Sequence, residues 1–295
     1  MTSDSRLAWG IIGTGSIART FAKSIPTSAT GRLVAVGSRT QAAADAFAKD
    51  FPSLRAHGSY EALLSDPDVQ AVYISTPHPM HAEWAVRAAR AGKHILCEKP
   101  IAMNHAEAMA AAEAARQNGV FLMEAFMYRS HPQTARIVEI IRSGRLGKLR
   151  LIEATFAFDA GYFNPESRLF SKDLGGGAIL DVGCYCMSMT RLLAGAAEGK
   201  PFAEPIQMKA IANLAESGAD EQTQALLTFP NGLQARLITA TRLDLGGNVT
   251  VTGSDAVLRI PSPWICEHPT SRIEIVTKDK VEVIEISSEA PLYSI

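Results

Sequence analysis

The chain has 295 residues, a formal net charge of −1 and an apolar fraction of 47%. This length suits one or two domains with sizeable cores, and the balanced charge without a basic run argues against nucleic-acid or anionic-membrane partners. No apolar stretch reaches the length of a membrane span, and the first residues lack a basic region followed by an apolar one. We therefore expect a cytoplasmic protein, in which the four cysteines are reduced thiols.

An early stretch, LAWGIIGTGSIA, matches the G-x-G-x-x-G/A turn that binds dinucleotides. Gly13 allows a tight turn after a buried strand, Gly15 lets the backbone approach a pyrophosphate, and Ala18 lets the next helix pack close to the strand. The first helical residues, Ser16 and Ile17, would present free N–H groups to the phosphates. The alternative is a tight strand–helix turn without a ligand.

The second predicted strand, residues 33–38, ends where NAD-specific sites carry an Asp or Glu for the ribose 2′-hydroxyl. This chain has Ser38, Arg39 and Thr40 there. An Arg beside a small hydroxyl residue suits a 2′-phosphate, because the guanidinium can bind it through two hydrogen bonds and no carboxylate repels it. NADP is therefore the favoured cofactor, and NAD stays possible if Arg39 only stacks on adenine or is solvated.

Strands and helices alternate through the first 125 residues. Apolar runs predict strands at 7–12, 33–38, 69–76, 94–97 and 120–125. Helical periodicity predicts helices at 17–25, 40–51, 60–64, 81–91 and 104–119. Thr40 and Asn104 are the expected N-caps of two of them, the second with a capping-box Glu107. This order predicts a doubly wound parallel sheet that forms a dinucleotide-binding domain of residues 1–125.

Two loops of this half follow buried strands, where doubly wound sheets bind ligands. Thr76 and Pro77 begin the first loop and are candidate cofactor contacts. Farther along, His81 either touches the cofactor ribose or only orients the loop. Glu98 and Lys99 begin the second loop, before a proline whose cis or trans state the sequence leaves open. Both are candidate cofactor contacts, and Lys99 is also a candidate catalytic cation, the alternative being a solvated lysine.

The pattern changes near residue 126. Helices are predicted at 133–141 and 178–193, and strands at 148–158, 206–214, 223–229, 233–241, 248–252, 256–260, 272–277 and 281–286. The tripeptide Pro230-Asn231-Gly232 is a hairpin signal. We expect an α+β domain, residues 126–295, with a large, mostly antiparallel open sheet.

A glycine-rich segment, GGGAILDVGCYC, holds the second set of candidate catalytic groups. Asp181 and Tyr185 are four residues apart and would share one face of a helix. A tyrosine can exchange a proton with a carbinol–carbonyl pair if a nearby cation, such as Lys99, lowers its pKa. The alternative for Tyr185 is a core phenol hydrogen-bonded to Asp181.

Metal chemistry is not expected. The spacing Cys184-x-Cys186 is too short for a zinc knuckle, and His78 and His81 have no accompanying cluster of cysteines, histidines or carboxylates.

Together these motifs resemble the glucose–fructose oxidoreductase/inositol dehydrogenase (Gfo/Idh/MocA) family. The similar stretches are GIIGTGSIA, VGSRT, YEALLSDPDVQAVYISTPHPMHAEWAVRAARAGKHILCEKP, MEAFMYRSHPQ and GGGAILDVGCYC. The chain resembles in particular the branch with dimeric dihydrodiol dehydrogenase, NADP-linked xylose dehydrogenase and glucose–fructose oxidoreductase. In that branch a tyrosine, here Tyr185, occupies the position where inositol dehydrogenases carry histidine.

The resemblance implies an N-terminal Rossmann domain and hydride transfer between NADP and a hydroxyl-bearing carbon of a sugar, polyol or trans-dihydrodiol. It implies that Lys99 and Tyr185 form the catalytic pair and that Asp181 orients substrate and nicotinamide. It further implies a homodimer or homotetramer paired through the sheet of the second domain.

The resemblance also suggests substrate contacts at Arg129, His131 and Arg168, whereas packing is the more natural role for Phe170. Family members usually continue into a C-terminal helix, and we expect that helix to be absent here, because no helical pattern follows Ile286. Two other functions stay open: an NAD-linked, inositol-type dehydrogenase and a non-catalytic NADP-binding sensor.

Overall fold

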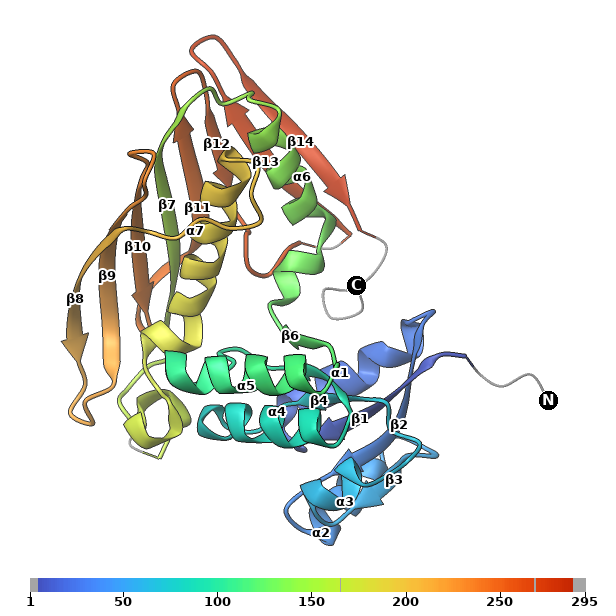
Figure 1. The fold of residues 1–295 in the computed structure, drawn as a ribbon. Helices are drawn as coiled ribbons and strands as arrows, with labels where there is room; N and C mark the ends of the chain where they lie inside the picture. The colour runs from blue at the N-terminus through green and yellow to red at the C-terminus, as the bar shows by residue number, and fades with distance from the viewer. Residues whose placement is uncertain (1–4, 165, 268, 289–295) are drawn as a thin grey trace. The chain divides into compact units, whose positions relative to one another are not determined.

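The computed structural model describes residues 5–164, 166–267 and 269–288 (Figure 1). The described chain forms two compact units, residues 5–125 and residues 126–288. The expected absence of a C-terminal helix concerns residues 289–295, which lie outside the described residues.

The first unit is built on a parallel sheet with the strand order β3-β2-β1-β4-β5-β6. Its strands are β1 (Leu7–Ile12), β2 (Gly31–Gly37), β3 (Arg55–His57), β4 (Ala71–Ile74), β5 (His94–Cys97) and β6 (Leu122–Glu124). Its helices are α1 (Ser16–Ser24), α2 (Gln41–Ala48), α3 (Tyr60–Leu64), α4 (His81–Arg90) and α5 (His105–Gln117). The order reverses between β1 and β4, where sheets of this kind bind ligands. The predicted doubly wound sheet is confirmed.

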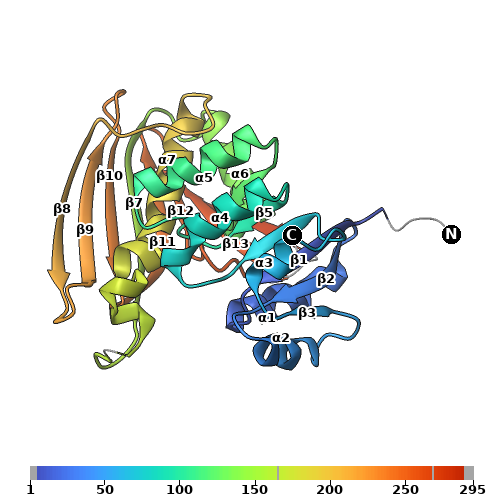
Figure 2. The same ribbon diagram turned by 60° about the horizontal axis from the view of Figure 1, so that its bottom comes forward.

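Helices cover both faces of this sheet because the buried strands are apolar on both sides. On one face, Phe21 of α1 and Phe47 of α2 pack with Ile11 of β1. In the view of Figure 2, α1 and α2 lie below β1, β2 and β3. On the other face, α3, α4 and α5 bury Leu63, Trp84 and a row of alanines against β1, β4 and β5. Each fully buried large apolar side chain contributes about 1.5–3 kcal/mol.

The predicted N-caps are confirmed. The Ala43 N–H donates to Thr40 Oγ1 at 3.3 Å, and the Glu107 N–H donates to Asn104 Oδ1 at 3.0 Å. Two details differ from the prediction. Strand β3 was not expected, because three residues are too few to show a period, and α2 ends at Ala48 rather than near residue 51.

The second unit contains one large sheet with the strand order β14-β13-β12-β11-β7-β10-β9-β8. Its strands are β7 (Leu149–Asp159), β8 (Gln207–Leu214), β9 (Asp220–Thr228), β10 (Gln234–Ala240), β11 (Arg242–Gly253), β12 (Val257–Ile260), β13 (Thr270–Val276) and β14 (Val281–Ser287). The pair β7–β10 is parallel, and the other neighbours are antiparallel. The predicted mostly antiparallel sheet is therefore confirmed.

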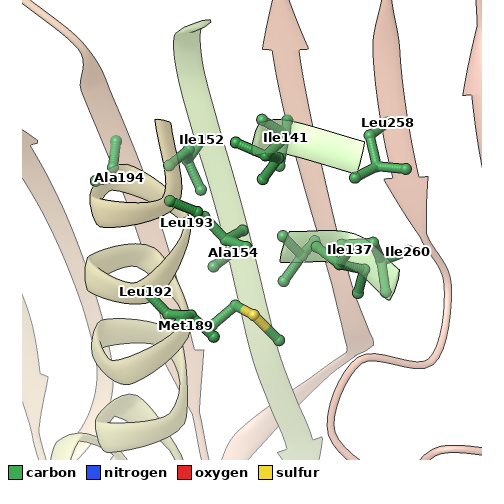
Figure 3. Close-up of a cluster of buried hydrophobic side chains, with 14 of the residues drawn as sticks. Ile137, Ile141, Ile152, Ala154, Met189, Leu192, Leu193, Ala194, Leu258 and Ile260 are labelled. Carbon is green, nitrogen blue, oxygen red and sulfur yellow. The ribbon is translucent and has the colours of Figure 1, made fainter. Parts of the chain in front are cut away.

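One face of this sheet carries helices α6 (Pro132–Arg142) and α7 (Cys184–Ala197). Figure 3 shows their apolar side chains meeting those of the strands, with Met189 and Leu193 of α7 beside Ala154 of β7, and Ile137 of α6 beside Ile260 of β12. The helices do not reach over β8 and β9 (Figure 1), and every residue of β8 is exposed.

The predicted helix over residues 178–193 needs a correction. Its first turn, Ile179–Gly183, is a π-helix, and α7 begins only at Cys184. A π-helical turn in a longer helix is frequent at functional sites, and this one ends two residues before Tyr185.

Candidate active site

The first glycine turn has the geometry of a phosphate cradle. Gly13 has φ +108°, a conformation that favours glycine, and a Cβ there would lie 2.9 Å from Ser75 Oγ. A Cβ on Gly15 would meet no atom of the described residues within 4 Å, so the space in front of it is open. Gly15 is the N-cap of α1 and no side chain caps that helix, so the N–H groups of Ser16 and Ile17 can bind an anion. These residues fit a dinucleotide.

The segment after β2 lies next to the glycine turn, at the carboxyl end of the neighbouring strand. The Ser38 N–H donates to the His57 carbonyl at 3.1 Å, and Thr40 is committed to capping α2. Arg39 is exposed and makes no side-chain hydrogen bond or ion pair within the described residues, so its guanidinium can receive a phosphate. Burial raises the pKa of the Tyr60 phenol, and the nearby charge of Arg39 opposes this shift.

The loop after β4 contains a buried polar atom that lacks a partner. Thr76 is 7% exposed, and its Oγ1 has no hydrogen bond among the described residues. Such an orphan is costly unless a ligand or water satisfies it. Its position after β4, at the reversal of strand order, fits the expected cofactor edge, which Pro77 continues.

Lys99 lies on a loop whose backbone N–H groups donate hydrogen bonds to glutamate side chains. The Lys99 N–H donates to Glu98 Oε2 at 3.3 Å, and the Ile101 N–H donates to Glu124 Oε1 at 2.9 Å. The Tyr73 hydroxyl donates to the other oxygen of Glu98. The peptide bond between Lys99 and Pro100 is cis, which settles the isomer that the sequence left open.

His81 joins the two loops. Its ring lies between the carbonyl oxygens of Thr76 and Pro100, at 2.7 Å from each. The predicted role in orienting the loop has direct geometric support. The other predicted role, a contact with the cofactor ribose, stays a prediction.

In the second unit, the glycine-rich segment turns tightly before the π-helical turn. Gly177 has φ +108°, and a Cβ on it would lie only 2.3 Å from Asp220 Oδ1. Asp220 Oδ2 accepts hydrogen bonds from the Ile179 N–H at 3.0 Å and from Thr223 Oγ1 at 2.7 Å. Burial raises the pKa of the Asp220 carboxyl, and these hydrogen bonds oppose the shift. Asp220 therefore anchors the start of the segment that carries Asp181.

Tyr185 lies within a cluster of aromatic rings and is 5% exposed. Its ring centroid is 5.2 Å from that of Phe126, 5.4 Å from Phe156, 5.9 Å from Tyr128 and 6.0 Å from Trp264. These rings come from three separate segments of the second unit. They restrict the orientation of the phenol and surround it with apolar surface.

Asp181 is paired with one of the predicted substrate contacts. Arg168 Nη2 donates to Asp181 Oδ1 at 3.0 Å, and the carboxylate is mostly buried while the guanidinium is half exposed. Thus the structure brings together Arg168 and Asp181, which the sequence placed in one site on separate grounds.

The other two predicted substrate contacts have structural partners. The Arg129 guanidinium lies over the ring of Phe202 at 4.6 Å from its centroid. His131 is buried, and its Nδ1 accepts a hydrogen bond from the Gln133 N–H at 3.1 Å, which caps α6. Phe170 is buried against Phe163, in line with the expected packing role. Contact of Arg129 or His131 with substrate stays a prediction.

Sequence reasoning missed several residues that hold the candidate groups in place. Asp220 is 41 residues from Ile179, and Tyr73 is 25 residues from Glu98. No local motif marks either residue. Both contacts join segments that are distant in the chain, so they depend on the tertiary packing.

The described part of the chain contains no group of three or more His, Cys, Asp or Glu side chains suited to a metal ion. All four cysteines are free. None of the helices in the described residues has the length and hydropathy that a bilayer crossing requires.

Two family models match the chain. One, described as "Oxidoreductase family, NAD-binding Rossmann fold", matches residues 7–126, and one for the GFO/IDH/MocA C-terminal domain matches residues 134–259.

Among curated proteins, an uncharacterized oxidoreductase from Rhizobium meliloti is 38% identical over 87% of this chain and 75% of its own length. The trans-1,2-dihydrobenzene-1,2-diol dehydrogenase of Mus musculus is 34% identical over 88% of this chain and 75% of its own length. Among solved structures, a 3-ketoreductase from Actinomadura kijaniata in complex with NADP and TDP-benzene superposes with a TM-score of 0.84 and 28% identity. That match covers 98% of this chain and 86% of the other.

Proposed function

Because this chain belongs to the Gfo/Idh/MocA family of oxidoreductases, we propose that it transfers a hydride reversibly between NADP and a hydroxyl-bearing carbon of a sugar, polyol or trans-dihydrodiol. The observation that carries the proposal is Tyr185, a phenol enclosed by four aromatic rings two residues after the end of a π-helical turn. The dihydrodiol dehydrogenases and the NADP-bound ketoreductase among its relatives support the substrate class and the cofactor.

NADP supplies the hydride acceptor or donor when it is bound. The N–H groups after Gly15 would bind its pyrophosphate, and Arg39 would bind its 2′-phosphate. The orphaned Thr76 hydroxyl would gain a partner in the bound state. These roles need only groups of the first unit.

In the direction of oxidation, Tyr185 takes the proton of the substrate hydroxyl while the electron pair of the adjacent C–H bond leaves as hydride. The charge of Lys99 stabilises the phenolate form of Tyr185, so that a phenol can act as a base near neutral pH. Asp181, held by Arg168, accepts a hydrogen bond from a second substrate hydroxyl and orients the carbon to be oxidised. Reduction of a carbonyl reverses each step.

Related solved structures include variants of the same ketoreductase with a tyrosine changed to phenylalanine and with a lysine changed to alanine. In that enzyme a tyrosine and a lysine were thus chosen for substitution. This choice is in line with the Lys99–Tyr185 pair proposed here.

For assembly, we propose that a second copy of the chain packs on the outer face of the large sheet. This face carries a shallow groove of about 680 Å³ along β8, β9 and β10. It exposes Ile211 and Leu226 beside Lys209 and Arg236, a mixture of apolar and polar groups typical of subunit interfaces. Light scattering of wild type and Ile211→Asp tests this proposed interface. A wild-type dimer or tetramer that dissociates in the variant supports the interface, and a molar mass that is the same in both contradicts it.

The test of the activity is an absorbance assay at 340 nm with NADP or NAD and a panel of trans-dihydrodiols, aldoses and inositols. Reduction of NADP by a diol or an aldose supports the proposal. Turnover of an inositol with NAD would favour an inositol-type dehydrogenase instead. Tight NADPH binding without turnover of any member of the panel would favour a sensor.

A further inference from the structure

The ring of His81 faces two hydrogen-bond acceptors at once. Nε2 lies 2.7 Å from the carbonyl oxygen of Thr76, and Nδ1 lies 2.7 Å from the carbonyl oxygen of Pro100. Both distances are those of well-formed N–H···O bonds. The residue is only 1% exposed, so it is enclosed by the protein.

A carbonyl oxygen accepts hydrogen bonds and donates none, so each ring nitrogen needs its own proton to bond its carbonyl. Neutral imidazole carries a proton on one nitrogen only. Its other nitrogen would direct a lone pair at a carbonyl oxygen, and an unmade hydrogen bond is expensive in a buried place. An imidazolium satisfies both carbonyl groups.

We propose that His81 is a doubly protonated, positively charged clamp that ties the Thr76–Pro77 loop to the Lys99–Pro100 loop and so positions Lys99. The positioning of Lys99 for hydride transfer rests on the proposed function. The protonation state does not, because it follows from the two acceptors alone.

The surroundings of the clamp suit a buried cation. Glu98 directly follows β5. Glu124 is the last residue of β6, the strand that pairs with β5. Burial raises the pKa of the Cys97 thiol, and the charges of these two carboxylates raise it further, so negative potential gathers at this sheet edge. Other titratable side chains here are Lys99 on the second loop, Tyr73, bonded to Glu98, and His78, whose ring centroid is 5.5 Å from that of His81.

The clamp acts through the backbone. Pro100 directly follows Lys99, and the Thr76 carbonyl belongs to the residue with the orphaned hydroxyl. If the clamp is cut, the two loops can move apart, and both NADPH affinity and turnover should fall. Glu98 and Glu124 hold the same loop at two backbone N–H groups, so the loop should shift rather than unfold.

The first test is nitrogen-15 NMR of the full-length chain labelled at histidine, at neutral pH. The signals of His81 are identified by their loss in His81→Gln, or in His81→Asn if the first variant does not fold. Long-range ring correlations separate protonated from unprotonated ring nitrogens. We expect both nitrogens of His81 to be protonated, and one unprotonated nitrogen would overturn the charged clamp. This measurement needs no turnover, so failure of the proposed function would leave it intact.

The second test compares His81→Gln with His105→Gln, a change at the exposed first residue of α5. A glutamine donates from one nitrogen and cannot span both carbonyl groups. For His81→Gln we expect the dissociation constant for NADPH to rise roughly tenfold or more, as for the loss of a hydrogen bond to a charged group. We also expect the kcat of this variant to fall. The control should match wild type. Wild-type affinity and kcat in His81→Gln would refute the positioning role.

Discussion

The two units gather their candidate groups in different ways. In the first, Gly13, Arg39 and Lys99 each follow a strand of one parallel sheet, so chain order alone brings them to the same edge. In the second, Tyr185 is enclosed by rings from distant segments, and Asp220 anchors its helix from 41 residues away. The arrangement in the first unit follows from the local pattern of strands, turns and helices. The arrangement in the second unit depends on contacts between side chains that are far apart in the chain.

This difference predicts how each unit responds to mutation. In the first unit, substitutions at Arg39 and Lys99 should each remove one function, binding or proton transfer, and leave the other. In the second, substitutions at residues that never touch substrate should lower turnover, because they displace the groups that do. Three predictions test this contrast, and a fourth concerns the stability of the first unit.

The largest effect is expected for Lys99→Met. In the proposed mechanism Lys99 stabilises the Tyr185 phenolate, so its loss should lower kcat about 10²–10⁴-fold, the usual range for loss of acid–base function. NADPH affinity should change little, because other groups bind the phosphates. Steady-state kinetics with a fluorescence titration separates the two quantities, and Lys23→Met, an exposed change in α1, is the control. Full turnover in Lys99→Met would remove this residue from the chemistry.

Next comes Arg39→Ala. Loss of hydrogen bonds between the guanidinium and a 2′-phosphate should raise the NADPH dissociation constant about 10–100-fold and leave NADH unchanged. Parallel fluorescence titrations measure both constants. Arg90→Ala, at an exposed position in the last turn of α4, should bind both cofactors like wild type. Equal losses for NADPH and NADH would contradict the assigned 2′-phosphate contact.

A smaller effect is expected for Asp220→Ala. Without the carboxylate, the Ile179 N–H loses its partner and the π-helical turn shifts, so kcat should fall roughly tenfold while NADPH affinity stays the same. Thr223→Val, which removes one of the bonds to Asp220, should act in the same direction but less. Glu216→Ala, exposed in the preceding turn, is the control. If Asp220→Ala reduces NADPH binding as much as turnover, the contrast between the units is wrong.

The smallest effect concerns the stability of the first unit. Burial tends to raise the pKa of Asp66, but hydrogen bonds from Arg55, the Asp68 N–H and His57 outweigh it and lower the pKa. A lowered pKa in the folded state gives stability that is present above the unfolded pKa, about 3.9, and lost as pH falls through the folded value.

Asp66→Asn should therefore cost about 1–3 kcal/mol at pH 7 and less as the pH falls below the unfolded pKa, where the contribution of the wild-type carboxylate is progressively lost. Urea unfolding at pH 7 and pH 3 measures this difference, and the exposed Asp279→Asn serves as a control. An equal cost at both pH values would show that the charge of Asp66 contributes nothing.

The same contrast explains which features of the fold could be predicted from the sequence. Glycine spacing, the caps at Thr40 and Asn104 and the strand-helix alternation are local, and the structure follows them closely. The π-helical turn was not foreseeable, because GGGAILDVG reads as an ordinary helix start. Asp220 and the aromatic neighbours of Tyr185 were also missed, since contacts between distant segments depend on tertiary packing, which a single sequence does not display.

The candidate site shows the same division. Arg168 and Asp181 were proposed separately, and the structure pairs them. Arg129 and His131 were proposed on the same grounds, yet one stacks on Phe202 and the other caps α6. Residue type and position in a motif pointed to a segment but could not tell which of its side chains turn toward the protein interior.

The central claim is that Tyr185 exchanges the substrate proton. The most direct measurement is the NADP-dependent kcat of Tyr185→Phe beside that of Tyr162→Phe, an exposed tyrosine of the same unit, with NADPH affinity measured for both. We predict that Tyr185→Phe loses at least about 100-fold in kcat at unchanged NADPH affinity, while Tyr162→Phe matches wild type. Wild-type turnover in Tyr185→Phe would contradict the account.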